Sequence, residues 1–153
     1  GLEANFYLFG WLVLIGADSN RDESSLLTAY DDAAGVTAEF NLNLLRRINR
    51  ELAGSFDLDG FRHLARYNRQ HCRIEMHLVS VRRQRAEVLR RNFEFRADET
   101  IHTENSYKYD PAALAALARA AGLHRRAAWT DGERRFGVHL FDTGETSSAA
   151  AAK

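Results

Sequence analysis

The chain has 153 residues, a length that fits one domain or part of a larger one and that suffices for a sizeable hydrophobic core. Its 21 basic and 21 acidic residues leave no net charge, which argues against nucleic acid or an anionic membrane as the main partner. The only cysteine, Cys72, excludes an internal disulfide and indicates a reducing cytoplasm.

The first distinctive segment is the apolar run FYLFGWLVLI, residues 6–15. It is too short to span a membrane, and no basic residue precedes it as one would in a signal peptide. Because it is apolar on both faces, it predicts a strand buried in a largely parallel sheet with helices on each side. Ligands gather beyond the carboxyl ends of such strands, so Asp18 either lies near a site or opens a turn.

Two helices are expected next. Asp22 or Ser24 can cap the first helix, which carries Tyr30 and is interrupted at Gly35. The second runs from about residue 36 to residue 52, with apolar residues at helical spacing.

Asn41 and Asn43 are unusual in this second helix, because asparagine side chains compete for backbone hydrogen-bond partners. Solvent exposure and a functional role both explain them, and exposure is the commoner reason. The connector FDLDGF, residues 56–61, follows, and its two aspartates are interpreted as caps because the later glycine and glutamate of a calcium loop are absent.

From residue 63 the pattern changes to strands, expected over residues 63–68, 73–80 and 86–96. In the second of these, Met76 shares a face with other apolar side chains. Methionine on such a face either fills the core or contacts a ligand, and core filling is the commoner role.

The stretch ETIHTENSYKYD, residues 99–110, is predicted to be extended, with His102, Glu104, Ser106 and Lys108 on one face. A carboxylate and a hydroxyl two residues apart can converge on one small ring, and an imidazole offers nitrogens on opposite sides. A strand with one solvated face shows the same pattern, and spacing alone does not decide between the two.

The chain then shows a helix start at Asp110 and Pro111 and a helix end at Gly122. Two strands around Asp131 predict a hairpin, and residues 142–153 predict a flexible tail. The architecture expected from these elements is mixed α/β.

Motifs for metals and cofactors are missing from the sequence. His102 and Glu104 form the H-x-E half of a zinc deaminase signature, but its P-C-x-x-C half cannot exist with one cysteine and one proline. There is no H-E-x-x-H, no Walker loop and no G-x-G-x-x-G after a strand. Cys72 and His71 face opposite ways if extended. We therefore expect no metal site and assign no catalytic residue.

Five stretches together carry a family resemblance. They are similar to the histidine-specific, S-adenosylmethionine-dependent methyltransferases, the family of the ergothioneine-pathway enzyme that methylates the α-amino group of L-histidine. The similarity covers about residues 14–141. The stretches are AYDDAAGVTAEFNLNLLRRINREL at residues 29–52, FDLDGF at 56–61, RIEMHL at 73–78, TENSYKY at 103–109 and WTD at 129–131.

The resemblance implies a fold: the carboxy-terminal part of a class I methyltransferase-like (Rossmann-like) sheet with an inserted α+β substrate-binding subdomain. Residues 1–141 would form the partial methyltransferase domain and about 53–109 the insertion. The family's glycine-rich cofactor loop would lie before residue 1. The resemblance therefore implies S-adenosylmethionine as the cofactor of the full-length enzyme, none bound by this chain alone, and no activity alone.

The resemblance also implies a substrate site for histidine or a close relative. Glu104 and Ser106 would hold the imidazole, Met76 would pack against it, and Tyr30 would contact the carboxylate. The chain departs from the family at residues 19–22, Ser-Asn-Arg-Asp, where the family tends to have a leucine and a Lys-Asp pair.

Two functions follow from this resemblance. The first is the substrate-binding half of an N-methyltransferase, active when another chain supplies the missing amino-terminal half. The alternative is a non-catalytic module that keeps the fold and self-associates through the apolar surface left uncovered.

Overall fold

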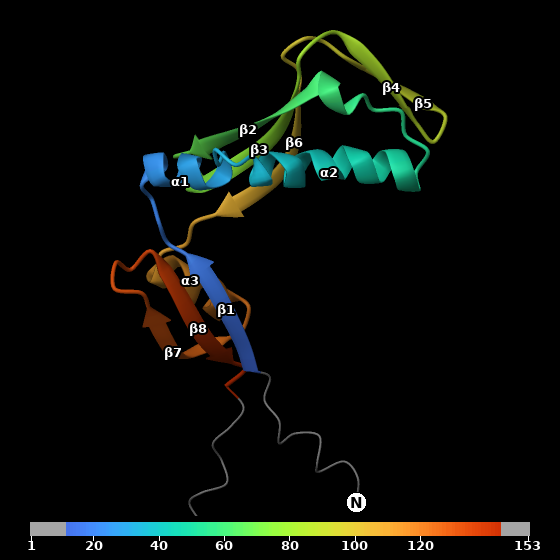
Figure 1. Cartoon of the computed structure of the whole chain (residues 1–153). Coiled ribbons are helices and arrows are strands. Elements are labelled where there is room, and N and C mark those ends of the chain that lie inside the picture. The colour runs from blue at the N-terminus through green and yellow to red at the C-terminus, as the bar shows by residue number, and fades with distance from the viewer. Residues whose placement is uncertain (1–11, 145–153) are drawn as a thin grey trace, which may run out of the picture. The chain divides into compact units, whose positions relative to one another are not determined.

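The computed structural model describes residues 12–144, which form two compact units (Figure 1). The first unit combines the described residues up to Asn20 with those from Lys108 onward, and the second is Arg21–Tyr107. No helix within residues 12–144 combines the length and the apolar character that a membrane crossing requires. The elements are β1 Leu12–Asp18, α1 Glu23–Tyr30, α2 Val36–Glu51, the 3-10 turn η2 Leu58–Gly60, β2 Phe61–Asn68, β3 Arg73–Ser80, β4 Gln84–Val88, β5 Arg91–Phe95, β6 Thr100–Tyr107, α3 Pro111–Ala120, β7 His124–Thr130 and β8 Phe136–Asp142.

The first unit is a sheet of order β1-β8-β7, in which both pairings are antiparallel. Its core lies on one side, where Ala17 and Phe141 pack against Leu114 and Ala118 of α3. The hairpin predicted around Asp131 is confirmed by the β7–β8 pairing.

The prediction for β1 was wrong in one respect. Within residues 12–144, β1 pairs only with β8, and it pairs antiparallel rather than in a parallel sheet. Helix α3 covers only the face that carries Ala17, so Leu12 and Leu14 on the other face are 68% and 65% exposed. The amino-terminal part of the predicted strand and most of the predicted flexible tail lie outside the described residues.

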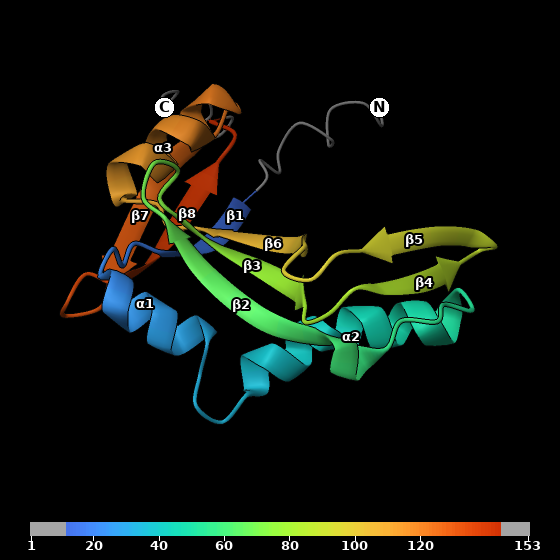
Figure 2. The same ribbon diagram turned by 90° about the horizontal axis from the view of Figure 1, so that it is seen from above.

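The second unit is an antiparallel sheet of order β2-β3-β6 with α1 and α2 against one face (Figure 2). Leu26 of α1 packs against Ile74 and Met76, and Leu45 of α2 packs against Leu78. This unit begins at Arg21, well ahead of residue 53, because both helices belong to its core.

One predicted strand of the second unit is a hairpin instead. Residues 86–96 were expected to be one strand, but β4 and β5 pair with each other across Leu89 and Arg90. Both of these residues have positive φ, 50° and 64°, as a two-residue type I′ turn requires. The turn lacks the usual asparagine or glycine, so no local signal in the sequence predicts it.

The helix starts follow the sequence signals. The Asp22 side chain accepts a hydrogen bond from the backbone N–H of Ser25, 3.1 Å, and caps α1. The Asp110 side chain does the same for α3 through the N–H groups of Ala112 and Ala113, with Pro111 at the first helical position. The predicted second helix is α2, whose bounds agree with the expected ones to within one residue.

The chain leaves the first unit after β1 and returns to it before α3 at neighbouring points. The backbone N–H of Tyr109 donates to the carbonyl of Asp18 at 2.9 Å. The Asp18 carboxylate also pairs with the Lys108 ammonium at 2.8 Å, and the Lys108 side chain is fully buried. Asp18 therefore joins the segment that leaves the first unit to the segment that returns to it.

Candidate functional site

A β-bulge in β6 decides which side chains of the predicted site lie together. Met76 of β3 pairs with Glu104, but the next residue, His77, pairs with His102, so Thr103 is an extra residue. The Thr103 hydroxyl donates to the Met76 carbonyl at 2.9 Å and fixes this position. One extra residue reverses the alternation of side chains, so Glu104 and His102 lie on opposite faces of the sheet.

The sequence prediction that His102, Glu104, Ser106 and Lys108 share one face was therefore wrong at both ends. His102 lies on the face away from the helices, opposite His77. Lys108 belongs to the first unit, where it pairs with Asp18. Glu104 and Ser106 are opposite Met76 and Ile74, whose side chains face α1.

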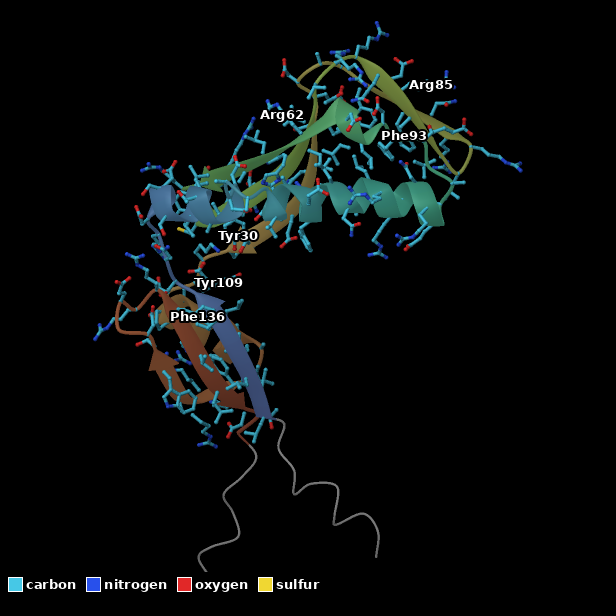
Figure 3. All side chains as sticks on the ribbon, in the orientation of Figure 1. Tyr30, Arg62, Arg85, Phe93, Tyr109 and Phe136 are labelled. Carbon is cyan, nitrogen blue, oxygen red and sulfur yellow. The ribbon has the colours of Figure 1, made fainter. Side chains whose placement is uncertain are left out.

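Tyr30, Met76 and Ser106 come together on the helix-covered face. Tyr30 is the last residue of α1 and is labelled in Figure 3. Its hydroxyl is 2.7 Å from the Ser106 hydroxyl, and either can be the donor. Met76, 3% exposed, belongs to the apolar cluster against which Tyr30 packs. Met76 therefore fills the core, the commoner of its two expected roles. The same side chain lies beside the Tyr30–Ser106 pair.

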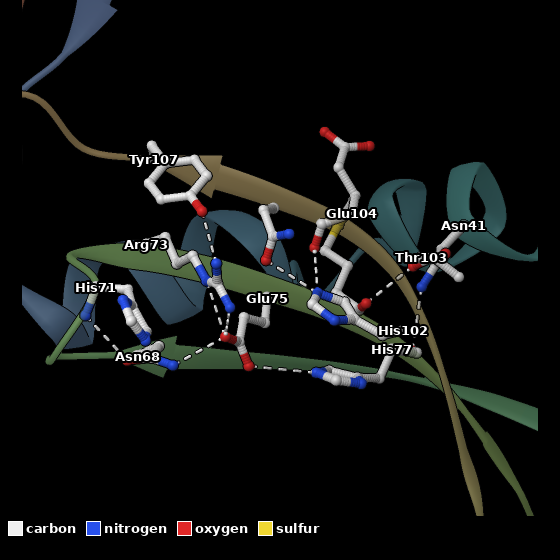
Figure 4. A network of polar contacts seen from close by, with 12 residues as sticks. Asn41, Asn68, His71, Arg73, Glu75, His77, His102, Thr103, Glu104 and Tyr107 are labelled. Carbon is white, nitrogen blue, oxygen red and sulfur yellow. Dashed lines mark hydrogen bonds and ion pairs between the residues drawn. The ribbon is translucent and has the colours of Figure 1, made fainter. Parts of the chain in front are cut away.

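Glu104 carries an available carboxylate next to this group. It pairs with Met76 across the strands and is two residues from Ser106. The side chain is exposed and points away from the histidines of the other face (Figure 4). Among residues 12–144, no group forms a hydrogen bond or an ion pair with this carboxylate. It borders a cavity of about 180 Å³ between α2 and β6, lined by Phe40, Asn41, Asn43, Leu44, Arg47 and Thr103.

A buried polar network that the sequence did not reveal holds the end of α1. The Asn41 amide donates to His63 Nδ1 at 2.9 Å and to the His77 carbonyl at 3.1 Å. His63 Nδ1 is then the acceptor, so its Nε2–H donates to the carbonyl of Tyr30 at 2.8 Å. Asn41 is 3% exposed, so exposure does not explain this asparagine, whereas Asn43 is exposed. An asparagine within an apolar helix pattern was the one available signal.

The opposite face of the sheet carries a charged network, shown in Figure 4. One oxygen of the Glu75 carboxylate accepts hydrogen bonds from Arg73 Nη2, 2.6 Å, and from the Asn68 amide, 2.9 Å. The Arg73 guanidinium, followed by Asn68, lowers the pKa of Glu75 to about 2. Arg73 also donates to the Tyr107 hydroxyl at 2.6 Å.

Comparison with known proteins gives a consistent set of relatives. Residues 5–143 match the family model described as "Histidine-specific methyltransferase, SAM-dependent". The "Histidine N-alpha-methyltransferase" of Mycobacterium tuberculosis is 48% identical over 130 residues, which cover 84% of this chain and 40% of that protein. The protein of the same name from Mycolicibacterium smegmatis is 44% identical over the same shares. "Ergothioneine biosynthesis protein 1" of Neurospora crassa is 30% identical over 143 residues, which cover 84% of this chain and 14% of that protein.

Proposed function

Because this chain belongs to the histidine-specific, S-adenosylmethionine-dependent methyltransferases, as its five stretches predicted, we propose that it is the substrate-binding part of a histidine Nα-methyltransferase of ergothioneine biosynthesis. The chain spans 40% of the length of its mycobacterial relatives. We propose that the remainder of such an enzyme supplies the cofactor-binding half, and that the reaction takes place in the cytoplasm.

The observation that carries this proposal is the grouping of Tyr30, Met76, Glu104 and Ser106 in one unit. The Glu104 carboxylate would accept an imidazole N–H in a charge-assisted hydrogen bond. Ser106 would serve the second ring nitrogen. Because either hydroxyl of the Tyr30–Ser106 pair can donate, the pair can adapt to the tautomer that is bound.

Met76 and Tyr30 complete the proposed site. The Met76 side chain, a buried member of the apolar cluster, would pack against the imidazole ring. The Tyr30 hydroxyl would contact the substrate carboxylate, as the resemblance implies. A ligand without ring N–H groups would leave the Glu104 carboxylate unpaired, and this mismatch gives selectivity for histidine.

We propose that this chain does not hold S-adenosylmethionine itself. In the turn after β1, the Ser19 hydroxyl donates to the Arg134 carbonyl and the Asn20 N–H donates to the Asp18 carboxylate. Both donors therefore form hydrogen bonds inside the first unit rather than pointing toward a ligand. No glycine-rich loop follows any strand between residues 12 and 144. We therefore assign to this chain the binding and orientation of the amine substrate, and the methyl donor to the rest of the enzyme.

The fold supports the same division. We propose that β1-β8-β7 is the carboxy-terminal edge of a Rossmann-like sheet, with residues 1–141 as the partial domain. We propose further that the substrate-binding insertion is the whole compact unit Arg21–Tyr107, which extends the range of about 53–109 expected from the resemblance. The second edge of β1 has no partner strand among the described residues, and Leu12 and Leu14 are exposed beside it. A strand from the rest of the enzyme would cover this edge. The alternative, a non-catalytic self-associating module, is not favoured by the comparisons.

Calorimetric titration of histidine into the 153-residue chain tests the proposal. We expect binding that Glu104→Ala abolishes, and no binding of the thiophene analogue of histidine, which has no ring nitrogen. Glu87→Ala is the matched control, because Glu87 is an exposed glutamate of β4 away from the pocket. Histidine binding that is unchanged in Glu104→Ala would contradict the assignment of the site. S-adenosylmethionine binding by this chain would contradict the division of labour.

A further inference from the structure

A second cluster of potential ligands lies on the face of the sheet away from the helices. Glu75 and His77 are two residues apart on β3 and share a face, and the bulge at Thr103 places His102 directly opposite His77 (Figure 4). The two imidazole rings stack, with centroids 4.6 Å apart and planes at 21°. The three side chains bring one carboxylate oxygen and two ring nitrogens within 4.8 Å of one another.

His77 is unusual because it is buried without hydrogen bonds. It is 7% exposed, and neither of its ring nitrogens has a hydrogen-bond partner among the described residues. Its Nε2 lies 3.6 Å from the Glu75 Oε2, beyond hydrogen-bond distance. Burying a polar ring without partners costs free energy, so the position of His77 requires an explanation.

The Glu75 carboxylate is already oriented for a further ligand. Arg73 and Asn68 both bind Oε1, whereas Oε2 is directed toward His77. Carboxylates that bind metals are held in this way by neighbouring hydrogen bonds.

We propose that Glu75, His77 and His102 bind a divalent transition-metal ion such as zinc. Two imidazoles and one carboxylate suit zinc, whereas calcium and magnesium prefer oxygen ligands alone. This proposal departs from the absence of a metal site expected from the sequence. It does not depend on the proposed function, because the cluster faces away from the Glu104 carboxylate.

Binding requires a small movement of one side chain. Bonds of about 2.0–2.2 Å to zinc bring tetrahedral ligand atoms to about 3.3–3.6 Å from one another. The His102 ring would turn inward and give up the contacts of its Nε2 with the Asn105 side chain, 2.9 Å, and with the Glu104 carbonyl, 3.2 Å. His102 is exposed, so this turn is open to it. The ion would then link β3 to β6 on the side opposite the substrate pocket.

Calorimetric titration of zinc chloride into the chelator-treated 153-residue chain at pH 7.5 tests this site. We expect one ion per chain and an affinity at least tenfold weaker in His102→Gln. Because His102 is exposed, this variant should stay folded. His71→Gln is the matched control, an exposed histidine of the same unit that lies outside the cluster, and its affinity should equal that of the parent chain.

A second readout separates a direct ligand from a structural effect. Cobalt(II) bound to the parent chain should give visible absorption bands typical of nitrogen and oxygen ligands, and these bands should change in both His102→Gln and Glu75→Gln. The proposal is overturned if the parent chain binds no zinc, or if zinc binds equally to the parent chain and to His102→Gln.

Discussion

Strands β1 and β3 both carry several large apolar side chains, yet their surroundings differ. β3 is the middle strand of its sheet, with β2 and β6 on either side and two helices on one face, so residues 76–80 are all buried. In β1, only Ala17 is buried, because one face and one edge have no cover among residues 12–144. Burial thus depends on neighbours rather than on side-chain character alone. β1 has a sequence suited to a neighbour that the described residues do not provide.

The same substitution in the two strands should give the largest contrast. Leu78→Ala in β3, where the side chain is fully buried, should lower the free energy of unfolding by about 2–5 kcal/mol. Leu14→Ala in β1, 65% exposed, should change it by less than about 0.5 kcal/mol. Urea denaturation, with amide hydrogen exchange to follow each unit separately, measures both. Equal losses would show that β1 is as well covered as β3.

The ion pair at the end of β1 should give the next largest effect. Asp18→Asn removes the carboxylate that neutralises the buried Lys108 ammonium, 2.8 Å away. A fully buried pair would lose about 3–5 kcal/mol, and because Asp18 is one-third exposed we expect about 1–3 kcal/mol. The loss should appear in hydrogen exchange of β8 and not of β3. Asp59→Asn, at an exposed aspartate of the second unit, is the control.

The second unit should lose stability in acid through Glu75. Its pKa falls from the usual 4.5 to about 2 in the folded chain, so its contribution is present above pH 4.5 and is lost as the pH falls toward 2. Arg73→Gln removes the main cause, and the acid transition followed by hydrogen exchange of β3 should lose this dependence. Arg69→Gln, at an exposed arginine, should retain it. Identical acid profiles for the two variants would contradict the role of Arg73.

The smallest effect on stability is expected at the open face of β1. Leu12→Ser with Leu14→Ser should leave the free energy of unfolding within about 0.5 kcal/mol of the parent chain. It should reduce self-association measured by sedimentation velocity, because exposed apolar side chains beside an open strand edge favour pairing between chains. Leu89→Ser, at a side chain that is also 65% exposed, should leave association unchanged. A parent chain that stays monomeric at high concentration would refute this prediction.

The helix starts were predictable because their signals are local. The side chains of Asp22 and Asp110 cap through bonds to residues two or three positions away, and the order of residues alone reveals them. The bulge at Thr103 was not predictable, because it depends on how β6 pairs with β3 and not on the pattern of β6 itself.

The candidate site divides in the same way. The two-residue spacing of Glu104 and Ser106 predicted that these side chains share a face. Their grouping with Tyr30 and Met76 was implied only by the family resemblance. The contacts of His63 with Asn41 and with the end of α1 join separate elements of the chain. The local pattern therefore showed an unusual asparagine at position 41 but not its partners.

The bond between Asp18 and Tyr109 has an evolutionary consequence. It brings the outgoing and returning chains of the first unit within 2.9 Å, so everything between them is attached as a cassette with both ends at one place. Such a cassette can be exchanged, lengthened or redesigned while the remaining scaffold keeps its own connections. Under the proposed function, replacing residues 21–107 as a whole would change the substrate preference without rebuilding the sheet of the first unit.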